Sequence, residues 1–370
     1  MALAGLLPGG SAGPTSSSDA TAASGSSSAA PPSTQASAAP ASTPASASDA
    51  TEVDLGSADA LPRAVLVGTD GRSTVLLTGP AGGTVLTVDG GRVTRRVPVD
   101  TDALLLDLVP ARDAAGDDLA VVLGQKRGGD AAVTEGRAVT LLAVSGDVVA
   151  ERPVRPPAMG DDEVTPRVAI SPDGRTLYVL TGGVRPPEVS AVDVGTGIVK
   201  KQTTLDPGFA GVIDRLALTV DGAEMAWAAL SGPGGASLVQ LSPLLDVRST
   251  TTAPDTTIDA VAVGAAGPLV ARRGDGLAVV TPTVTDDGKL SISGELLAGT
   301  AIAVAGTTLA VSHEGVGGKP TVSIGELGGQ ARTITLCPGD GDTWDVAAGP
   351  GSTFTVTGTC DGRARLWQVR

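Results

Sequence analysis

Three short loops rich in carboxylates carry the residues best suited to chemistry. They are Asp100 with Asp102, then Asp161, Asp162 and Glu163, then Asp340 and Asp342. Hard cations such as Ca²⁺ bind several carboxylate and carbonyl oxygens at once, so Asp161, Asp162, Glu163, Asp340 and Asp342 are candidate ligands for a divalent metal. None of the loops has the length or pattern of an EF-hand. Ordinary solvated turns explain the same residues, and the sequence leaves both interpretations open.

The single histidine, His313, is a weaker candidate. A catalytic histidine needs an orienting partner and a nucleophile or substrate within reach. Its neighbour Glu314 cannot orient it along a strand, because successive side chains of a strand point to opposite faces. The Ser-His-Glu-Gly segment around it instead predicts an exposed loop between two strands.

Basic residues occupy other predicted loops, and the chain holds none of the common catalytic motifs. The basic loop residues are Lys126, Arg127, Arg185, Arg272 and Arg273. With His313 and the acidic loops they would form a rim for a polar or anionic ligand, although mixed charge is also usual for a protein surface. We find no phosphate-binding loop, nucleophile elbow or dinucleotide fingerprint. We therefore predict no catalytic residue, and no cofactor other than Ca²⁺ as an alternative.

The composition favours strands and turns. The chain is 41% hydrophobic but only 2% aromatic, so its core must be built from Val, Leu, Ala and Ile. Abundant Val and Thr favour strands, and 51 glycines and 26 prolines suit a fold with many turns. A formal net charge of -14 disfavours nucleic acid as a partner. We find no apolar run of about 18 residues, so we expect no transmembrane segment in this chain.

Repeated units of about 40 residues set the predicted architecture, because this is the period of a β-propeller blade. The units cover residues 63–99, 102–154, 166–205, 212–252, 258–297, 300–336 and 343–369. Alternating apolar residues within them favour strands over helices. We predict an all-β protein, a β-propeller of about seven blades over residues 51–370. The last unit holds three strands, and residues 51–55 would supply the fourth and close the ring.

Two units resemble known propeller repeats. The third, ISPDGRTLYVLTGG followed by VSAVDVGTGIVKK, resembles the YVTN pattern, with SPDG at 171–174 as its first hairpin turn. The last, GTCDGRARLWQV, resembles the end of a WD40 repeat, with Asp361-Gly362 at the turn and Trp367 at the Trp position. The repeat's histidine is missing, and Gln368 replaces its usual Asp. The resemblance therefore implies a WD40-like propeller without the full WD40 signature.

Two enzymatic propeller families fit less well. Lactonase-like propellers bind a divalent metal with acidic residues and typically Asn, and this chain has no Asn. Streptogramin-lyase-like propellers use more than one histidine, and this chain has one. The same lack of Asn, with few Lys beside Arg, indicates a GC-rich bacterial genome.

The propeller arrangement brings the two cysteines together. Cys337 would lie just before the innermost strand of the last blade, and Cys360 would end the next strand, which runs antiparallel to it. We predict a disulfide, which closes a loop of about 22 residues and contributes roughly 3 kcal/mol in the chain-entropy model. The alternative is a pair of free thiols. A metal pair is disfavoured, because there is one His and no CxxC motif.

Residues 1–50 differ from the rest of the chain. Between residues 11 and 50 nearly every residue is Ser, Ala, Thr, Pro or Gly, so little apolar surface can be buried and we expect a disordered linker. Residues 1–10 lack the positive charge and the apolar length of a signal peptide. Either the true start lies upstream and the segment is what remains of an export signal or anchor, or the protein is cytoplasmic. We expect export, which a disulfide would also favour.

These observations predict a non-enzymatic propeller outside the cytoplasm, in the cell envelope or secreted. Its loops would bind a protein or cell-envelope partner, the tail would act as a tether, and we expect a monomer. The first alternative is a divalent-metal-dependent hydrolase or lactonase that uses the acidic loops. The second is a cytosolic propeller scaffold, which reduced cysteines would favour.

Overall fold

The computed structural model describes residues 50–56, 60–79, 82–99, 103–112, 118–126, 139–145, 148–153, 164–254, 256–264, 267–273, 277–280, 282–284, 290–292, 301–314, 318–326 and 331–370. For 103–106 and 313–314, and for the strands within 111–153 and 271–292, only the backbone is described. The predicted tail before Ala50, Arg127 and the acidic segment from Asp161 to Glu163 lie outside these residues. All described residues belong to one compact unit.

The described chain folds into small antiparallel sheets, of which six have four strands. The first three are β2 (Leu61–Val67), β3 (Ser73–Gly79), β4 (Gly82–Asp89) and β5 (Arg92–Val99); β6 (Ala103–Arg112), β7 (Asp118–Lys126), β8 (Val139–Ser145) and β9 (Val148–Pro153); and β10 (Arg167–Ile170), β11 (Thr176–Thr181), β12 (Glu188–Asp193) and β13 (Val199–Thr204). The other three are β14 (Arg215–Val220), β15 (Ala226–Gly232), β16 (Gly235–Leu241) and β17 (Val247–Ala253); β23 (Ala301–Ala305), β24 (Thr308–Glu314), β25 (Pro320–Glu326) and β26 (Ala331–Thr335); and β27 (Thr343–Ala348), β28 (Phe354–Cys360), β29 (Arg363–Val369) and β1 (Ala50–Asp54).

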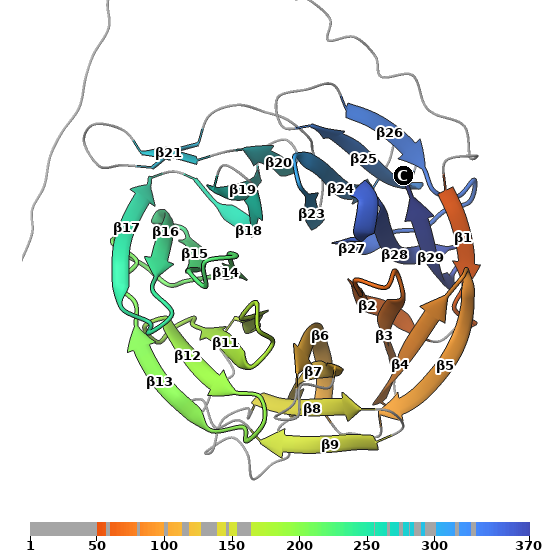
Figure 1. Cartoon of the computed structure of the whole chain (residues 1–370). Helices are drawn as coiled ribbons and strands as arrows, with labels where there is room; N and C mark the ends of the chain where they lie inside the picture. Colours follow the sequence, from red (N-terminus) through yellow and green to blue (C-terminus); the bar gives the residue numbers. More distant parts are fainter. Residues whose placement is uncertain are drawn as a thin grey trace, which may run out of the picture. The chain divides into compact units, whose positions relative to one another are not determined.

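These sheets form a β-propeller, as predicted. In the six four-stranded sheets, the strand given first above lies nearest the centre and the strand given last lies at the rim (Figure 1). The inner strands β2, β6, β10, β14, β18 (Ile258–Gly264), β23 and β27 contact one another in that order, and β27 contacts β2 again. The sheets are thus arranged radially around a closed ring of inner strands.

The prediction that an N-terminal strand completes the last sheet is confirmed. Strand β1 pairs antiparallel with β29 over five residues, from Ala50 opposite Val369 to Asp54 opposite Arg365. The last sheet therefore has the order β1-β29-β28-β27 and joins the two ends of the described chain (Figure 1). Pairing with β1 satisfies the backbone groups that an open edge at β29 would leave exposed.

The expectation of about seven equivalent four-stranded units is not met in full. The fifth unit forms a three-stranded sheet, from β18 through β19 (Gly267–Arg273) to β20 (Leu277–Val280). A separate pair follows, β21 (Pro282–Val284) with β22 (Leu290–Ile292). Because Pro282 has no backbone N–H to donate, β21 is poorly suited to continue the ladder beyond β20.

The core and the turns follow the sequence closely. Val, Leu and Ala supply most of the buried side chains, and Trp367, Tyr178 and Phe354 are the largest that are fully buried. The predicted SPDG turn joins β10 to β11, where Gly174 has a φ of 74 and its N–H donates to the Ser171 carbonyl at 2.8 Å. Among the described residues no helix is long and apolar enough to cross a membrane.

Candidate functional site

Charged residues lie in the first half of most inner strands around the centre of the propeller. We call these six residues the inner charged ring: Arg63 on β2, Asp107 on β6, Arg167 on β10, Arg215 on β14, Asp259 on β18 and Asp345 on β27. Strand β23, with the sequence AIAVA, is the one inner strand without a charged residue. The strands that carry these residues surround the centre of the propeller, where the blades converge (Figure 1).

β-bulges position four members of the ring. The pairing of β2 with β3 skips Arg63, and the pairing of β18 with β19 skips Asp259. On β6 and β27 the skipped residue directly precedes Asp107 and Asp345. A bulge breaks the strict alternation of side chains and re-aims one of them, which is why bulges are common beside functional sites.

Contacts made by ring members join neighbouring inner strands. Arg215 forms an ion pair with Asp259 across β14 and β18. The Arg167 Nε donates to the Leu216 carbonyl at 3.1 Å, which links β10 to β14, and the charge of Arg167 also acts on Asp107. The Asp345 Oδ2 accepts the N–H of Val65 at 2.9 Å, which links β27 to β2.

Two ring carboxyls hold their protons unusually tightly. Burial, with a smaller contribution from the charge of Asp107, raises the pKa of Asp345 to about 7, against the opposing effect of the N–H donors of Val65 and Val346. Burial likewise raises the pKa of Asp107 to about 6, against the effects of the Leu108 N–H and of Arg167. Each carboxyl therefore changes its charge close to neutral pH, so it can donate or accept a proton there.

Arg63 and Trp344 form a second feature beside these carboxyls. The guanidinium carbon of Arg63 lies 5.2 Å from the centroid of the Trp344 ring, within the range of a cation–π interaction. The Arg63 Nε and the Trp344 Nε1 are both buried, and neither has a hydrogen-bond acceptor among the described residues. Arg63 is not one of the charges that act on Asp107 or Asp345. The Trp344 side chain is half-buried.

The raised pKa of Asp345 predicts an inverted pH dependence of stability. The pKa is 3.8 for an ordinary Asp and about 7 in the folded chain, so between these values the folded state holds a proton that the unfolded state has lost. The stability contributed by that proton is fully present below about pH 4 and is lost as the pH rises through 7. In Asp345→Asn the side chain cannot titrate. The difference in free energy of unfolding between the wild type and this variant should thus be about 1–2 kcal/mol more favourable to the wild type at about pH 5.5 than at about pH 8.

Urea unfolding of both proteins at the two pH values checks this prediction. Thr51→Ala, at an exposed position without a titratable group, serves as the control and should differ from the wild type by the same amount at both pH values. The proposed protonation of Asp345 is contradicted if the wild type exceeds Asp345→Asn in free energy of unfolding by the same amount at both pH values, or by more at about pH 8.

The chain topology defines two faces of the propeller. We call the face with the starts of the inner strands the loop face; it also carries the links between second and third strands and those from each outer strand to the next inner strand. Hydrogen bonds join these links, as where the Ile213 N–H donates to the Gly183 carbonyl at 3.3 Å and the Gly341 N–H to the Gly318 carbonyl at 2.9 Å. The opposite face, which carries the remaining hairpin turns, is the turn face.

Asp340 and Asp342 lie on the loop face, and both are exposed. Their backbone groups fix the loop against β28, since the Asp340 carbonyl accepts the Asp361 N–H and the Asp342 carbonyl accepts the Thr359 N–H, both at 2.8 Å. Within the described ranges no group of three or more His, Cys, Asp or Glu is placed to hold a metal ion. The predicted partners Asp161, Asp162 and Glu163 lie outside those ranges, so the metal site stays a prediction.

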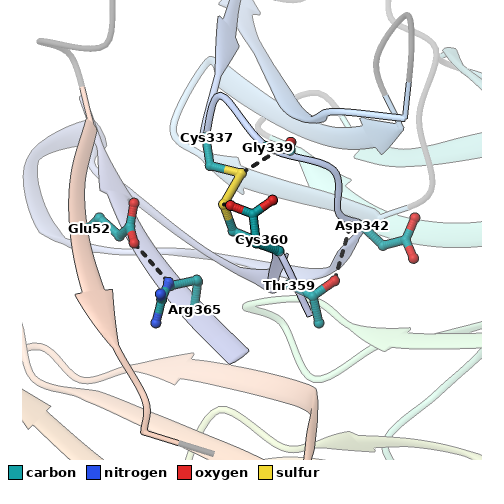
Figure 2. The surroundings of a disulfide bond; sticks show 8 residues. Glu52, Cys337, Gly339, Asp342, Thr359, Cys360 and Arg365 are labelled. Carbon is teal, nitrogen blue, oxygen red and sulfur yellow. Dashed lines mark hydrogen bonds and ion pairs between the residues drawn. A yellow bond between two sulfur atoms is a disulfide. The ribbon is translucent and has the colours of Figure 1, made fainter. Parts of the chain in front are cut away.

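The predicted disulfide is present. Cys337 and Cys360 are bonded, with their Cα atoms 6.3 Å apart (Figure 2). The bond joins the segment that leads into β27 to the end of β28. Figure 2 also shows the Asp342 N–H, which donates to the Thr359 Oγ1 at 3.2 Å in the same segment. The bond therefore fixes one connection on the loop face close to the inner strand that carries Asp345.

The predicted basic rim is only partly described. Arg185 is exposed in the β11–β12 link on the loop face, and Lys126, Arg272 and Arg273 end their strands on that side. Arg127 lies outside the described residues. The prediction of a loop around His313 is wrong: His313 lies within β24, opposite Thr321 of β25. The run TLAVSHE continues the alternation of the strand, which extends the ladder to Glu314.

Sequence reasoning missed the inner charged ring, although a signal was present. One charged residue, or two in IDRLAL, stands at or near the start of several predicted first strands, as in LPRAV, TPRVAI, IDRLAL, TIDAVAV and TWDVAA. Aligning the repeats on their first strands would have placed these charges together. The bulges that orient them, however, have no distinct sequence signature.

Comparisons with known proteins support the fold alone. No family model and no curated protein matches the chain. A catalytically inactive virginiamycin B lyase from Staphylococcus aureus with quinupristin superposes with a TM-score of 0.58 at 11% identity, over 87% of this chain and 99% of that chain. The selenomethionine-substituted lyase of the same species gives 0.57 at 12%, over 86% and 98%. A streptogramin B lyase gives 0.57 at 13%, over 87% and 97%. At these identities the chain is similar to those enzymes in architecture.

Proposed function

We propose that this chain is a non-enzymatic β-propeller that works outside the cytoplasm and binds a protein or cell-envelope partner through its loop face. Residues 51–370 would form the propeller and residues 1–50 a tether. The observation that carries the proposal is the inner charged ring. It brings three arginines and three aspartates onto the inner strands of the propeller.

The ring is costly for stability, which argues for a role in binding. Burying charged or polar groups is unfavourable unless they are fully paired. Here two carboxyls have raised pKa values because of burial, and the Nε of Arg63 has no acceptor within the described part of the chain. Polar groups that a fold keeps at such a cost commonly serve a ligand or partner.

The disulfide supports a location outside the cytoplasm. Disulfides persist in oxidising compartments and are rare in the cytosol, where thiols are kept reduced. Both cysteines of the chain are used in the one bond, and both are buried. A cytosolic scaffold, the alternative location, would instead have these two cysteines reduced.

Site-specific photo-crosslinking tests the proposed binding face. Val184 and Ile198 belong to the same blade and are similarly exposed, at 64% and 63%, but Val184 lies in a loop-face link and Ile198 in a turn-face hairpin. We expect a photo-crosslinking residue at position 184 of the full chain, expressed in its native cells, to yield an adduct of defined mass. The same residue at position 198 should not.

The paired positions make the result interpretable. Equal adducts at 184 and 198 would indicate non-specific capture, and an adduct at 198 alone would place the partner on the turn face. Either outcome contradicts the proposal, as does the absence of any adduct at 184 under conditions where the protein is folded and abundant.

A second candidate is an enzyme. Asp107 and Asp345 change charge near neutral pH, as a general acid or base should, and the fold is shared with virginiamycin B lyase. This candidate includes a metal-dependent hydrolase or lactonase that uses Asp340 and Asp342. It predicts turnover of quinupristin or a lactone that Asp345→Asn abolishes, or a loss of thermal stability in EDTA. Our first proposal predicts neither.

We also propose that the propeller has seven blades. The six four-stranded sheets and the sheet β18-β19-β20 each contribute one strand to the closed ring of inner strands. Strand β22 contacts β17, the outer strand of the preceding sheet, so the pair β21–β22 would cover the rim of the fifth blade. On this interpretation the fifth blade is irregular rather than missing.

A further inference from the structure

Arg63 and Trp344 bring unused hydrogen-bond donors together at the inner charged ring. Their side chains come from the first and last blades, through bulges on β2 and β27, and stack with the guanidinium carbon 5.2 Å from the ring centroid. The Nε of Arg63 and the Nε1 of Trp344 are buried without an acceptor within the described ranges. Native proteins pair nearly all such groups, so two in one place indicate an acceptor that comes from outside the chain.

The neighbouring carboxyls do not satisfy these donors. The Asp345 Oδ1 accepts the Val346 N–H at 2.8 Å and its Oδ2 accepts the Val65 N–H at 2.9 Å, so both oxygens are directed at the backbone. The Asp107 Oδ1 accepts the Leu108 N–H at 2.8 Å, and the charge that acts on Asp107 is that of Arg167. Among the described residues, no carboxylate lies within ion-pair distance of Arg63.

The local charge also favours an anion. Burial raises the pKa of Asp345 to about 7 and that of Asp107 to about 6, so at neutral pH their negative charge is only partly developed. The charge of Arg63 is always present. An arginine stacked on an aromatic ring keeps its planar fork in a fixed orientation, which suits two-point contact with carboxylate or phosphate oxygens.

We propose that Arg63 and Trp344 form an oxyanion-binding site at the loop-face end of the inner strands, which takes a phosphate or carboxylate group of the partner. The guanidinium would supply the charge and paired donors, and the indole N–H would add a donor after a small side-chain adjustment. The site rests on the proposed binding function, because it names the chemistry by which the loop face would recognise its partner.

Titration of the full chain with inorganic phosphate, and separately with acetate, tests the site. We expect saturable binding by calorimetry with a change in tryptophan fluorescence. Arg63→Gln should weaken binding at least tenfold, and Trp344→Phe should abolish the fluorescence change. Arg248→Gln removes the same charge from an exposed position on β17 and should leave affinity within twofold. The anion that binds with the higher affinity identifies the chemical group of the ligand.

Melting curves of all variants establish that each is folded. The inference is wrong if the wild type binds neither anion, or if Arg63→Gln and Arg248→Gln bind equally well. The two proposals can fail separately. If an adduct forms at position 184 but no anion binds, only the oxyanion site is wrong. If an anion binds in a way that depends on Arg63 but no adduct forms, only the proposal of a partner on the loop face is wrong.

Discussion

Deleting residues 50–56 should abolish the cooperative unfolding of the propeller. These residues contain β1, whose five-residue pairing with β29 completes the last sheet. Val53 and Leu55 are 4% and 0% exposed, and Leu55 packs in a cluster shared by the first and last sheets. The Arg96 Nη2 also donates to the Leu55 carbonyl at 2.9 Å. Removing the segment would open an edge at β29 and expose the seam between the two blades.

Point variants separate the loss of closure from a general effect of truncation. Leu55→Ala should lower the free energy of unfolding by about 2–5 kcal/mol, as expected for a fully buried leucine. Thr51→Ala changes an exposed residue of the same strand and should cost no more than about 0.5 kcal/mol. Both are measured by urea unfolding. A truncated chain that unfolds with wild-type cooperativity would show that β1 does not close the ring.

Removing the disulfide should produce the second large effect. The bond links residues 23 apart in the sequence, for which the chain-entropy model gives about 3 kcal/mol of stabilisation. The double variant Cys337→Ala/Cys360→Ala should therefore unfold at a lower urea concentration than the wild type. The segment should keep its course, because the backbone bonds from Asp340 and Asp342 to the end of β28 remain.

A reducing agent provides the matched control for this prediction. It should lower the stability of the wild type to that of the double variant and leave the double variant unchanged. The disulfide does not contribute as proposed if the reductant leaves the stability of the wild type unchanged, or if the double variant is as stable as the oxidised wild type. Free thiols in protein purified from native cells would remove the main support for a location outside the cytoplasm.

Much of the fold follows from the sequence, because propeller blades repeat short-range patterns. The alternation in LYVLT, the SPDG turn and the Asp361-Gly362 turn each specify a local hairpin, and the repeats place the hairpins in order. The closing strand was predictable because the last unit lacked one strand. The disulfide followed from the antiparallel relation of β27 and β28.

The site was less predictable, because it depends on relations between blades. Asp107 and Asp345 are about 240 residues apart in the sequence and meet only through the ring of inner strands. On four of the inner strands a bulge shifts the alternation of side chains that sequence reasoning relies on. The fifth unit was predicted to have a full set of strands for a related reason: the spacing of its apolar residues does not show that the strand ladder ends before Pro282.

The most direct test of the account measures whether the inner charged ring serves the partner. In the chain with the photo-crosslinker at position 184, Arg63→Gln is compared with Arg248→Gln on the outer strand β17. We predict that Arg63→Gln lowers the yield of the loop-face adduct at least tenfold, while Arg248→Gln leaves it unchanged. An equal yield from both variants, with both proteins folded, would contradict the claim that the ring is the centre of the binding site.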